Sequence, residues 1–185
     1  MVLPIVAYGD PVLRKKGEDI TKDYPGLEKL IDDMYETMEK AKGVGLAAPQ
    51  INKAIRLFVI DSTRMYDEGE EEQGLREVFI NAQITEESGK EWPYEEGCLS
   101  IPGIREDVYR EEKVKIKYLD RNFKAHEKTF TGLTARVIQH EYDHIEGKLF
   151  IDHLKPLKKS LLKGRLEKIS KGNVDVEYKM RFPKV

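Results

Sequence analysis

The stretch "TGLTARVIQHEYDHIEG", residues 131–147, has the pattern of one amphipathic helix. Apolar residues recur three or four positions apart, which predicts a helix over residues 133–145. Thr131 precedes this segment as a candidate N-cap, and Gly147 follows it as a stop signal. We therefore expect a single helix with a defined start and end.

Two histidines mark one face of this helix. His140 and His144 are four residues apart, so both imidazoles project from the same side and could hold one metal ion. Glu141 stands between them, and a carboxylate beside a metal-activated water can accept its proton and later pass it to a leaving amine. The structural alternatives are a half-buried polar patch for the histidines and a solvated helix residue for Glu141.

A catalytic metal site built this way needs a third protein ligand. Phe150 stands where the metzincin pattern places a third histidine, which excludes that class. The remaining candidate donors are His126, Asp152, His153, Glu167 and the lone cysteine, Cys98. Cys98 alone has a distinctive context, a turn bounded by Gly97 and by "PG" at 102–103 that can direct its side chain inward. The alternative for Cys98 is an inert buried thiol.

The rest of the chain predicts a mixture of helix and strand. A helical pattern covers residues 27–41, and β-branched and aromatic residues indicate strands at 55–60, 77–84 and 113–119. The acidic stretch 61–77 is expected to be a solvated loop. The order helix, strands, helix predicts an α+β fold.

Composition limits the possible functions. A chain of 185 residues suggests one catalytic domain, residues 1–185, with a core large enough that any metal would be catalytic. Its 32 basic and 34 acidic residues nearly cancel, so no overall field favours DNA or a membrane. One cysteine allows no internal disulfide, and no apolar run approaches the ~20 residues of a membrane span. We expect a cytoplasmic protein.

The segment "GVGLAAPQ", residues 43–50, satisfies a dinucleotide-binding pattern, with Asp61 at a suitable distance downstream. Its context argues against a nicotinamide-dependent oxidoreductase, because it follows a helix and Pro49 would interrupt the helix that the fingerprint requires. The glycines can instead let a substrate backbone approach closely, and Gln50 can offer an amide N–H to a developing oxyanion.

Three motifs in this order, "GVGLAAPQ" (43–50), "EGCLS" (96–100) and "HEYDH" (140–144), resemble the signature motifs of the bacterial-type peptide deformylases. The similarity extends through "NAQI", "KVKIKYLDR" and "EGKLFIDHLKPLKK" and covers most of residues 1–165. It implies mainly antiparallel sheets packed around a central helix that carries H-E-x-x-H. Another H-E-x-x-H metallopeptidase or amidase is the alternative.

The resemblance implies removal of the N-formyl group from N-formylmethionine of nascent polypeptides, which gives formate and a free N-terminal methionine. It implies one divalent metal ion per chain, held by Cys98, His140 and His144 with water in the fourth position. Fe²⁺ is common in this family, and Zn²⁺, Ni²⁺ or Co²⁺ can substitute; the ligand types alone favour zinc. Glu141 would transfer the proton, while the Gln50 side chain and the Leu99 N–H would hold the oxyanion.

The resemblance also indicates substrate-binding residues. The segment Gly43-Val44-Gly45 would pair with the peptide like an added strand, with Gly97 and Arg105 near it. Leu133 and Val137 continue the stripe of the two histidines, which places a methionine pocket beside the metal; a plain core stripe is the alternative. Asp143 is a candidate supporting partner of the ligands.

The tail, residues 155–185, carries ten Lys or Arg residues against three Asp or Glu residues. Five apolar residues could form one side of a helix: Leu157, Leu161, Leu162, Leu166 and Ile169. In similar proteins a C-terminal helix contacts the ribosome. A basic helix packed on its own domain is the alternative.

Overall fold

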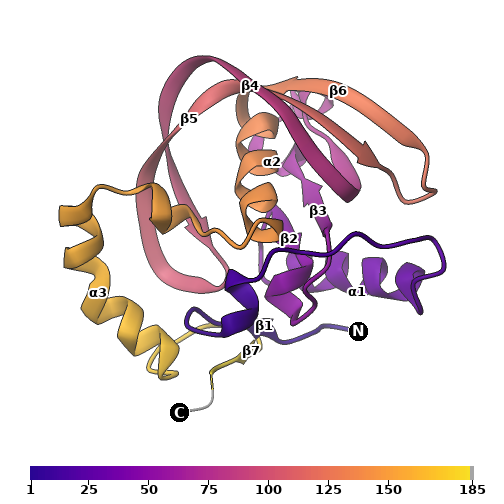
Figure 1. Cartoon of the computed structure of the whole chain (residues 1–185). Coiled ribbons are helices and arrows are strands. Elements are labelled where there is room, and N and C mark those ends of the chain that lie inside the picture. The colour runs from indigo at the N-terminus through magenta and orange to yellow at the C-terminus, as the bar shows by residue number, and fades with distance from the viewer. Residues whose placement is uncertain (184–185) are drawn as a thin grey trace.

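The computed structural model describes residues 1–183 and confirms the expected α+β fold. One antiparallel sheet contains five strands in the order β2 (Gly45–Ala47), β3 (Leu57–Asp61), β4 (Arg76–Cys98), β5 (Ile101–Leu119) and β6 (Ala125–Thr131). The remaining elements are β1 (Ile5–Val6), α1 (Leu27–Lys40), α2 (Gly132–Ile145), α3 (Pro156–Ser170) and β7 (Met180–Arg181). Figure 1 shows the strands curving around α2, as expected for a central helix.

The two faces of β3 explain how the sheet separates the helices. Successive side chains of a strand point to opposite sides. Phe58 and Ile60 pack in the cluster that includes α2 residues, whereas Leu57 and Val59 pack in the cluster that includes α1 residues. All five residues of β3 are therefore buried, and the sheet gives α2 a rigid support.

The central helix has the bounds that its sequence predicts to within one residue. Thr131 occupies the N-cap position in an extended conformation, although its side chain makes no capping hydrogen bond. Gly147, beyond the C-terminus, has φ of +75°, and a Cβ atom there would lie 2.6 Å from the Arg14 carbonyl oxygen. A glycine is required here for both reasons.

The two long strands differ from expectation in their length. The predicted strands 77–84 and 113–119 are only the apolar ends of β4 and β5, which pair onward from Glu86↔Lys115 to Cys98↔Ile101. The ladder hydrogen bonds of the backbone hold this extension, and its side chains are largely polar, so hydropathy does not reveal it. Cys98 ends β4, a two-residue turn follows at Leu99 and Ser100, and the "PG" pair at 102–103 lies inside β5 rather than bounding the turn.

The acidic stretch 61–77 is continuously exposed in its middle part, and its two ends are partly packed on the sheet and on α2. Residues 67–73 are exposed, whereas Asp61 ends β3 and Ser62 is buried. The Ser62 hydroxyl lies 2.7 Å from the Thr134 hydroxyl of α2. The loop is thus tied to the first turn of the central helix.

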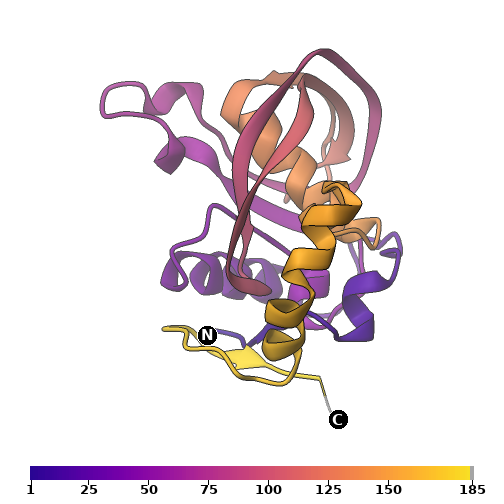
Figure 2. The same ribbon diagram turned by 90° about the vertical axis from the view of Figure 1, so that its left-hand side faces the viewer.

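The apolar side predicted for the tail is divided in the structure. Leu162, Leu166 and Ile169 of α3 are buried, but Leu157 and Leu161 are 73% and 69% exposed. After α3 the chain turns back, and β7 pairs in parallel with β1 at the opposite end of the sequence (Figure 2). Among residues 1–183 there is no helix with the length and apolar character of a membrane span.

Candidate active site

The fold brings one cysteine and two histidines together from separate elements. Cys98 lies at the end of β4, and His140 and His144 lie one turn apart on α2. One potential ligand atom from each residue lies within 4.8 Å of the others. Ligands of a tetrahedral zinc-type site, with bonds of 2.0–2.3 Å, are about 3.3–3.6 Å apart, so a small adjustment would close this set on one ion.

The state of the two imidazoles fits a metal site. Burial and, to a lesser extent, the neighbouring His140 together lower the pKa of His144 to about 3, so His144 is a neutral ligand-type imidazole. Its Nε2 lies 3.5 Å from Cys98 Sγ, and within residues 1–183 its buried Nδ1 has no hydrogen-bond partner. Burial also opposes charge on His140, but hydrogen bonds with Cys98 and Glu96 raise its pKa above the usual value. A metal ion would displace that proton.

A buried carboxylate orients His140. The Glu96 Oε1 lies 2.9 Å from His140 Nδ1, which leaves Nε2 directed to the site. Arg110 donates to both Glu96 oxygens, at 2.8 and 3.0 Å, and Arg136 adds a third bond at 2.8 Å. Burial would raise the pKa of Glu96, but the bonds from His140 and Arg110 hold it well below the usual value, so Glu96 stays ionised. Outer partners of this kind fix the tautomer and ring orientation of a metal ligand.

Sequence reasoning missed this support, although one signal was present. Glu96 precedes Cys98 by two residues, a spacing that directs strand side chains to one face. The two arginines gave no comparable signal. Asp143, the predicted supporting partner, reaches His140 only indirectly, because it accepts hydrogen bonds from Arg110 at 2.9 Å and His153 at 2.8 Å.

Glu141 is buried beside the three candidate ligands. Burial raises its pKa to about 7, its Oε1 lies 3.9 Å from His140 Nε2, and its Oε2 has no hydrogen-bond partner within the described chain. A Cβ atom on Gly45 would lie 2.6 Å from Glu141 Oε1, so only glycine leaves room for this carboxylate. The group can exchange a proton near neutral pH, as general acid–base chemistry requires.

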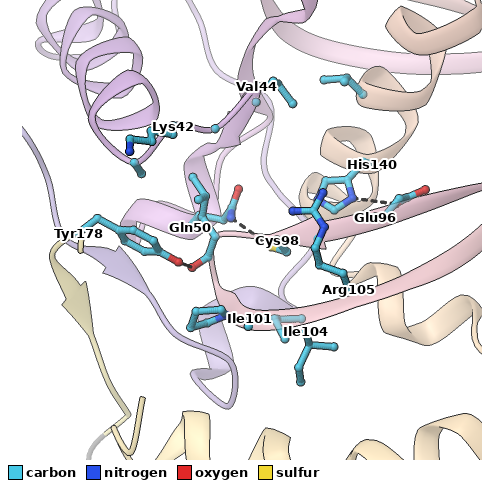
Figure 3. Close-up of a pocket in the computed structure, with 18 of the residues that line it drawn as sticks. Lys42, Val44, Gln50, Glu96, Cys98, Ile101, Ile104, Arg105, His140 and Tyr178 are labelled. Atoms are coloured by element: carbon cyan, nitrogen blue, oxygen red, sulfur yellow. Dashed lines mark hydrogen bonds and ion pairs between the residues drawn. The ribbon is translucent and has the colours of Figure 1, made fainter. Parts of the chain in front are cut away.

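Gln50 lies on the side of Cys98 opposite to His140 (Figure 3), and Leu99 follows Cys98 in the chain. The Gln50 amide nitrogen is 3.4 Å from Cys98 Sγ and donates to the Ser100 hydroxyl at 3.1 Å, while its oxygen accepts from the Ala47 N–H at 3.0 Å. This bonding fixes which end of the amide faces the sulfur (Figure 3). Leu99 begins the turn directly after Cys98, so its backbone N–H belongs to the peptide bond that follows the cysteine.

These groups line a cavity of about 630 Å³ (Figure 3). The predicted residues that contribute to its lining are Gly43, Val44, Gly45, Gln50, Gly97, Cys98, Leu99, Arg105, Val137, His140 and Glu141. His144 is buried behind this surface, and Leu133 is half-buried in the first turn of α2 without contributing to the lining. The cavity therefore includes most of the predicted substrate-binding residues.

The other candidate metal donors are engaged elsewhere. His126 pairs with Asp120 at 2.7 Å, and His153 pairs with Asp143. The remaining two are bound to basic residues: Asp152 to Arg14 and Glu167 to Lys171. Among the candidates, only Cys98 meets both histidines.

Comparison with known proteins agrees with this geometry. The polypeptide deformylase family matches residues 2–160. A peptide deformylase of Cytophaga hutchinsonii is 58% identical over 183 residues, which covers 99% of this chain and 98% of the relative. One from Christiangramia forsetii is 57% identical over 190 residues, with 99% and 97% covered.

Solved structures lead to the same result. A crystal structure of a peptide deformylase from Legionella pneumophila superimposes with a TM-score of 0.81 at 42% identity, covering 94% of this chain and 98% of that one. The peptide deformylase of Thermus thermophilus gives 0.82 at 39% identity, covering 93% and 99%. This chain belongs to the polypeptide deformylase family.

Proposed function

We propose that the cavity beside Cys98 is where this hydrolase removes the N-formyl group from N-formylmethionyl peptides. Family membership establishes deformylation of nascent peptides as the activity. The convergence of Cys98, His140 and His144 next to a buried Glu141 carries the assignment of the site. The products are formate and a peptide with a free N-terminal methionine.

Cys98, His140 and His144 would hold one divalent metal ion per chain. Sulfur and imidazole nitrogen suit several first-row metals, so the donor set fits Fe²⁺, Zn²⁺, Ni²⁺ and Co²⁺. We propose Fe²⁺ as the native ion on the basis of the family resemblance. The bound ion would polarise the formyl carbonyl and make a water molecule more acidic.

Glu141 serves as the proton carrier in this proposal. Its carboxylate accepts a proton from the water that attacks the formyl carbon and then delivers it to the departing methionine nitrogen. A pKa of about 7 suits both directions of transfer near neutral pH. The tight approach of Gly45 limits where the carboxylate can move.

Gln50 and Leu99 hold the oxygen on which negative charge develops. The Gln50 amide N–H and the Leu99 backbone N–H both lie beside Cys98, and donors arranged before the reaction stabilise charge without reorganisation. Ser100 and Ala47 support this role because they fix the orientation of the Gln50 amide.

The peptide binds along the segment that leads into β2, which among the described residues is an edge strand paired with β3 alone. The backbone of Gly43-Val44-Gly45 can therefore accept the substrate as a further strand. Val137 contributes to the methionine pocket, and Arg105, paired across the hairpin with Gly97, lies near the peptide. Leu133 would contribute only if the first turn of α2 moved toward the cavity.

We also propose that the chain works as one catalytic domain in the cytoplasm, where nascent peptides are made. The pairing of β1 with β7 supports one domain, since it joins the two ends of the sequence. Exposed Leu157 and Leu161 on the lysine-rich α3 support contact with the ribosome.

The test pairs metal content with product on one preparation. Protein purified without oxygen should contain about one metal ion per chain by elemental analysis, as a three-ligand site requires. It should release formate from formyl-Met-Ala but no acetate from acetyl-Met-Ala. Removal of the ion with a chelator should abolish release, and addition of Fe²⁺, Zn²⁺, Ni²⁺ or Co²⁺ should restore it. Formate release that does not depend on metal content would overturn the proposal.

A further inference from the structure

The chain segment after α3 forms part of the cavity wall. Residues 175–178, Asp-Val-Glu-Tyr, line the same cavity as Cys98 and His140. They lie outside residues 2–160, the part matched by the family. This part of the cavity wall therefore lies outside the three motifs that supply the proposed catalytic and metal-binding residues.

Two anchors hold the segment in place. On its C-terminal side, the Ile5 N–H donates to the Lys179 carbonyl oxygen and the Ala7 N–H donates to that of Arg181, both at 2.9 Å. On its N-terminal side, Val174 packs against the apolar cluster of α3. The wall is thus a defined surface of the fold.

Tyr178 connects the segment directly to the catalytic turn. Its hydroxyl donates to the Leu99 carbonyl oxygen at 2.7 Å (Figure 3). Leu99 packs closely on the other side as well, because a Cβ on Gly43 would lie 2.9 Å from Leu99 Cδ1. The wall therefore begins next to the turn that follows Cys98 and extends outward.

Side chains alternate along this segment. Val174, Val176 and Tyr178 are half-buried, whereas Asp175 and Glu177 are exposed at the cavity edge. Among the described residues, including the neighbouring basic residues of α3, no ion pair involves the carboxylate of Asp175 or Glu177. Both negative charges are thus available to a molecule that leaves the cavity along this side.

We propose that Asp175 and Glu177 form an acidic wall of the peptide channel that favours Lys or Arg in the residues after formyl-methionine. The inference rests on the proposed function, in which formyl-methionine occupies the inner part near Cys98. The following residues must then pass the cavity mouth, at about 3.3 Å per extended residue. Three exposed basic residues also line the cavity: Lys40 and Lys42 near the end of α1, and Arg105 of β5, which pairs with Glu95. The effect of the acidic wall is therefore measured as the change in peptide preference when the two acids are replaced.

The experiment compares formyl-Met-Ala-Lys-Lys amide with formyl-Met-Ala-Glu-Glu amide. Each kcat/KM is divided by that for formyl-Met-Ala on the same preparation, which corrects for the active fraction. Replacement of both acids, Asp175→Lys with Glu177→Lys, should lower the Lys-to-Glu preference about tenfold, since each exposed charge contributes modestly. The matched control, Glu68→Lys with Glu72→Lys, makes the same charge change at exposed loop residues that do not line the cavity.

The outcomes separate this inference from the proposed function. A tenfold change that occurs only in the wall variant and is largely lost in 1 M salt supports the acidic wall, because salt screens exposed charges. An equal change in the control variant, or no change in the wall variant, overturns it. Absence of formate from every peptide with the parent protein would instead overturn the proposed function.

Discussion

The floor and the rim of the cavity are built on different physical principles. The floor consists of Gln50, Cys98, His140 and Glu141, with His144 buried directly behind them, and apart from the half-buried Cys98 these side chains are buried or nearly so. The rim consists of Lys42, Arg105, Asp175 and Glu177, and all four are exposed. Floor residues touch one another or a fixed partner, whereas within the described chain the ion pair of the Arg105 side chain is with the similarly exposed Glu95, at 3.3 Å.

The difference assigns separate tasks to the two regions. A buried charged or polar group is strongly affected by each neighbour, so the floor can set pKa values and hold ligands in one geometry. Exposed charges contribute about 0–1 kcal/mol each and are screened by salt. We therefore expect large losses from single changes in the floor and small, substrate-dependent changes from the rim.

The largest effect should follow Cys98→Ala, which removes one of three proposed ligands. Loss of an outer partner of a metal ligand typically costs about 10–100-fold in metal affinity, so loss of a ligand itself should cost more. Elemental analysis after dialysis should find almost no metal, and formate release should fall below detection. His126→Ala is the control, because His126 pairs with Asp120 away from the site. A Cys98→Ala protein that kept one ion per chain and its activity would contradict the ligand set.

The next effect separates metal binding from proton transfer. Glu141→Gln keeps the size of the side chain and removes its base, so metal content should stay unchanged while formate release falls by about 10⁴ or more, since one group serves both attack and departure. Glu141→Asp should restore little, because a displacement of roughly an ångström can cost about a hundredfold. If Glu141→Gln worked within tenfold of the parent with its metal intact, another proton carrier would be required.

A smaller loss is expected from Gln50→Ala. Loss of one preorganised oxyanion donor typically costs about 10²–10³ in kcat, and the metal should remain because Gln50 is not a ligand in this proposal. The measurement is formate release together with elemental analysis. Gln83→Ala, which removes an exposed amide from β4, serves as the control. Equal rates for the two variants would exclude Gln50 from the reaction.

The sequence predicted the parts of the structure that short-range patterns determine. The spacing of His140 and His144 placed both on one helical face, and β-branched and aromatic residues located the apolar ends of β4 and β5. The motif resemblance placed Cys98 with them. The first two signals lie within a few residues of the chain, whereas the resemblance combines three short motifs spread over residues 43–144.

Contacts between distant residues could not be predicted in this way. Glu96 meets Arg110 and Arg136, which are 14 and 40 residues away, and Tyr178 reaches Leu99 across 79 residues. The tail shows the same limit, because the helical spacing of Leu157 and Leu161 is correct but that part of α3 meets no core. Periodicity predicts a helix and its apolar side, whereas only the tertiary structure decides how much of that side is covered.

The smallest effect concerns Tyr178, where rim and floor meet. Its ring packs against the cluster that includes α1 residues, and its hydroxyl donates to the Leu99 carbonyl oxygen at 2.7 Å. Burial raises the pKa of Tyr178 above its usual value, and Cys98 adds to this shift, so the hydroxyl stays a donor. Tyr178→Phe keeps the packing and removes only that hydrogen bond.

A net hydrogen bond contributes about 0.5–1.5 kcal/mol, so Tyr178→Phe should lower kcat/KM for formyl-Met-Ala by about two- to tenfold if the bond keeps the Leu99 turn in its working conformation. Metal content should not change, because the floor is intact. Tyr109→Phe is the matched control, since Tyr109 is 62% exposed on β5. Thermal unfolding of both variants shows whether a loss of rate follows a loss of stability. If Tyr178→Phe and Tyr109→Phe deformylate equally fast, the tail contributes only its charged wall, and the Leu99 turn is held by the floor alone.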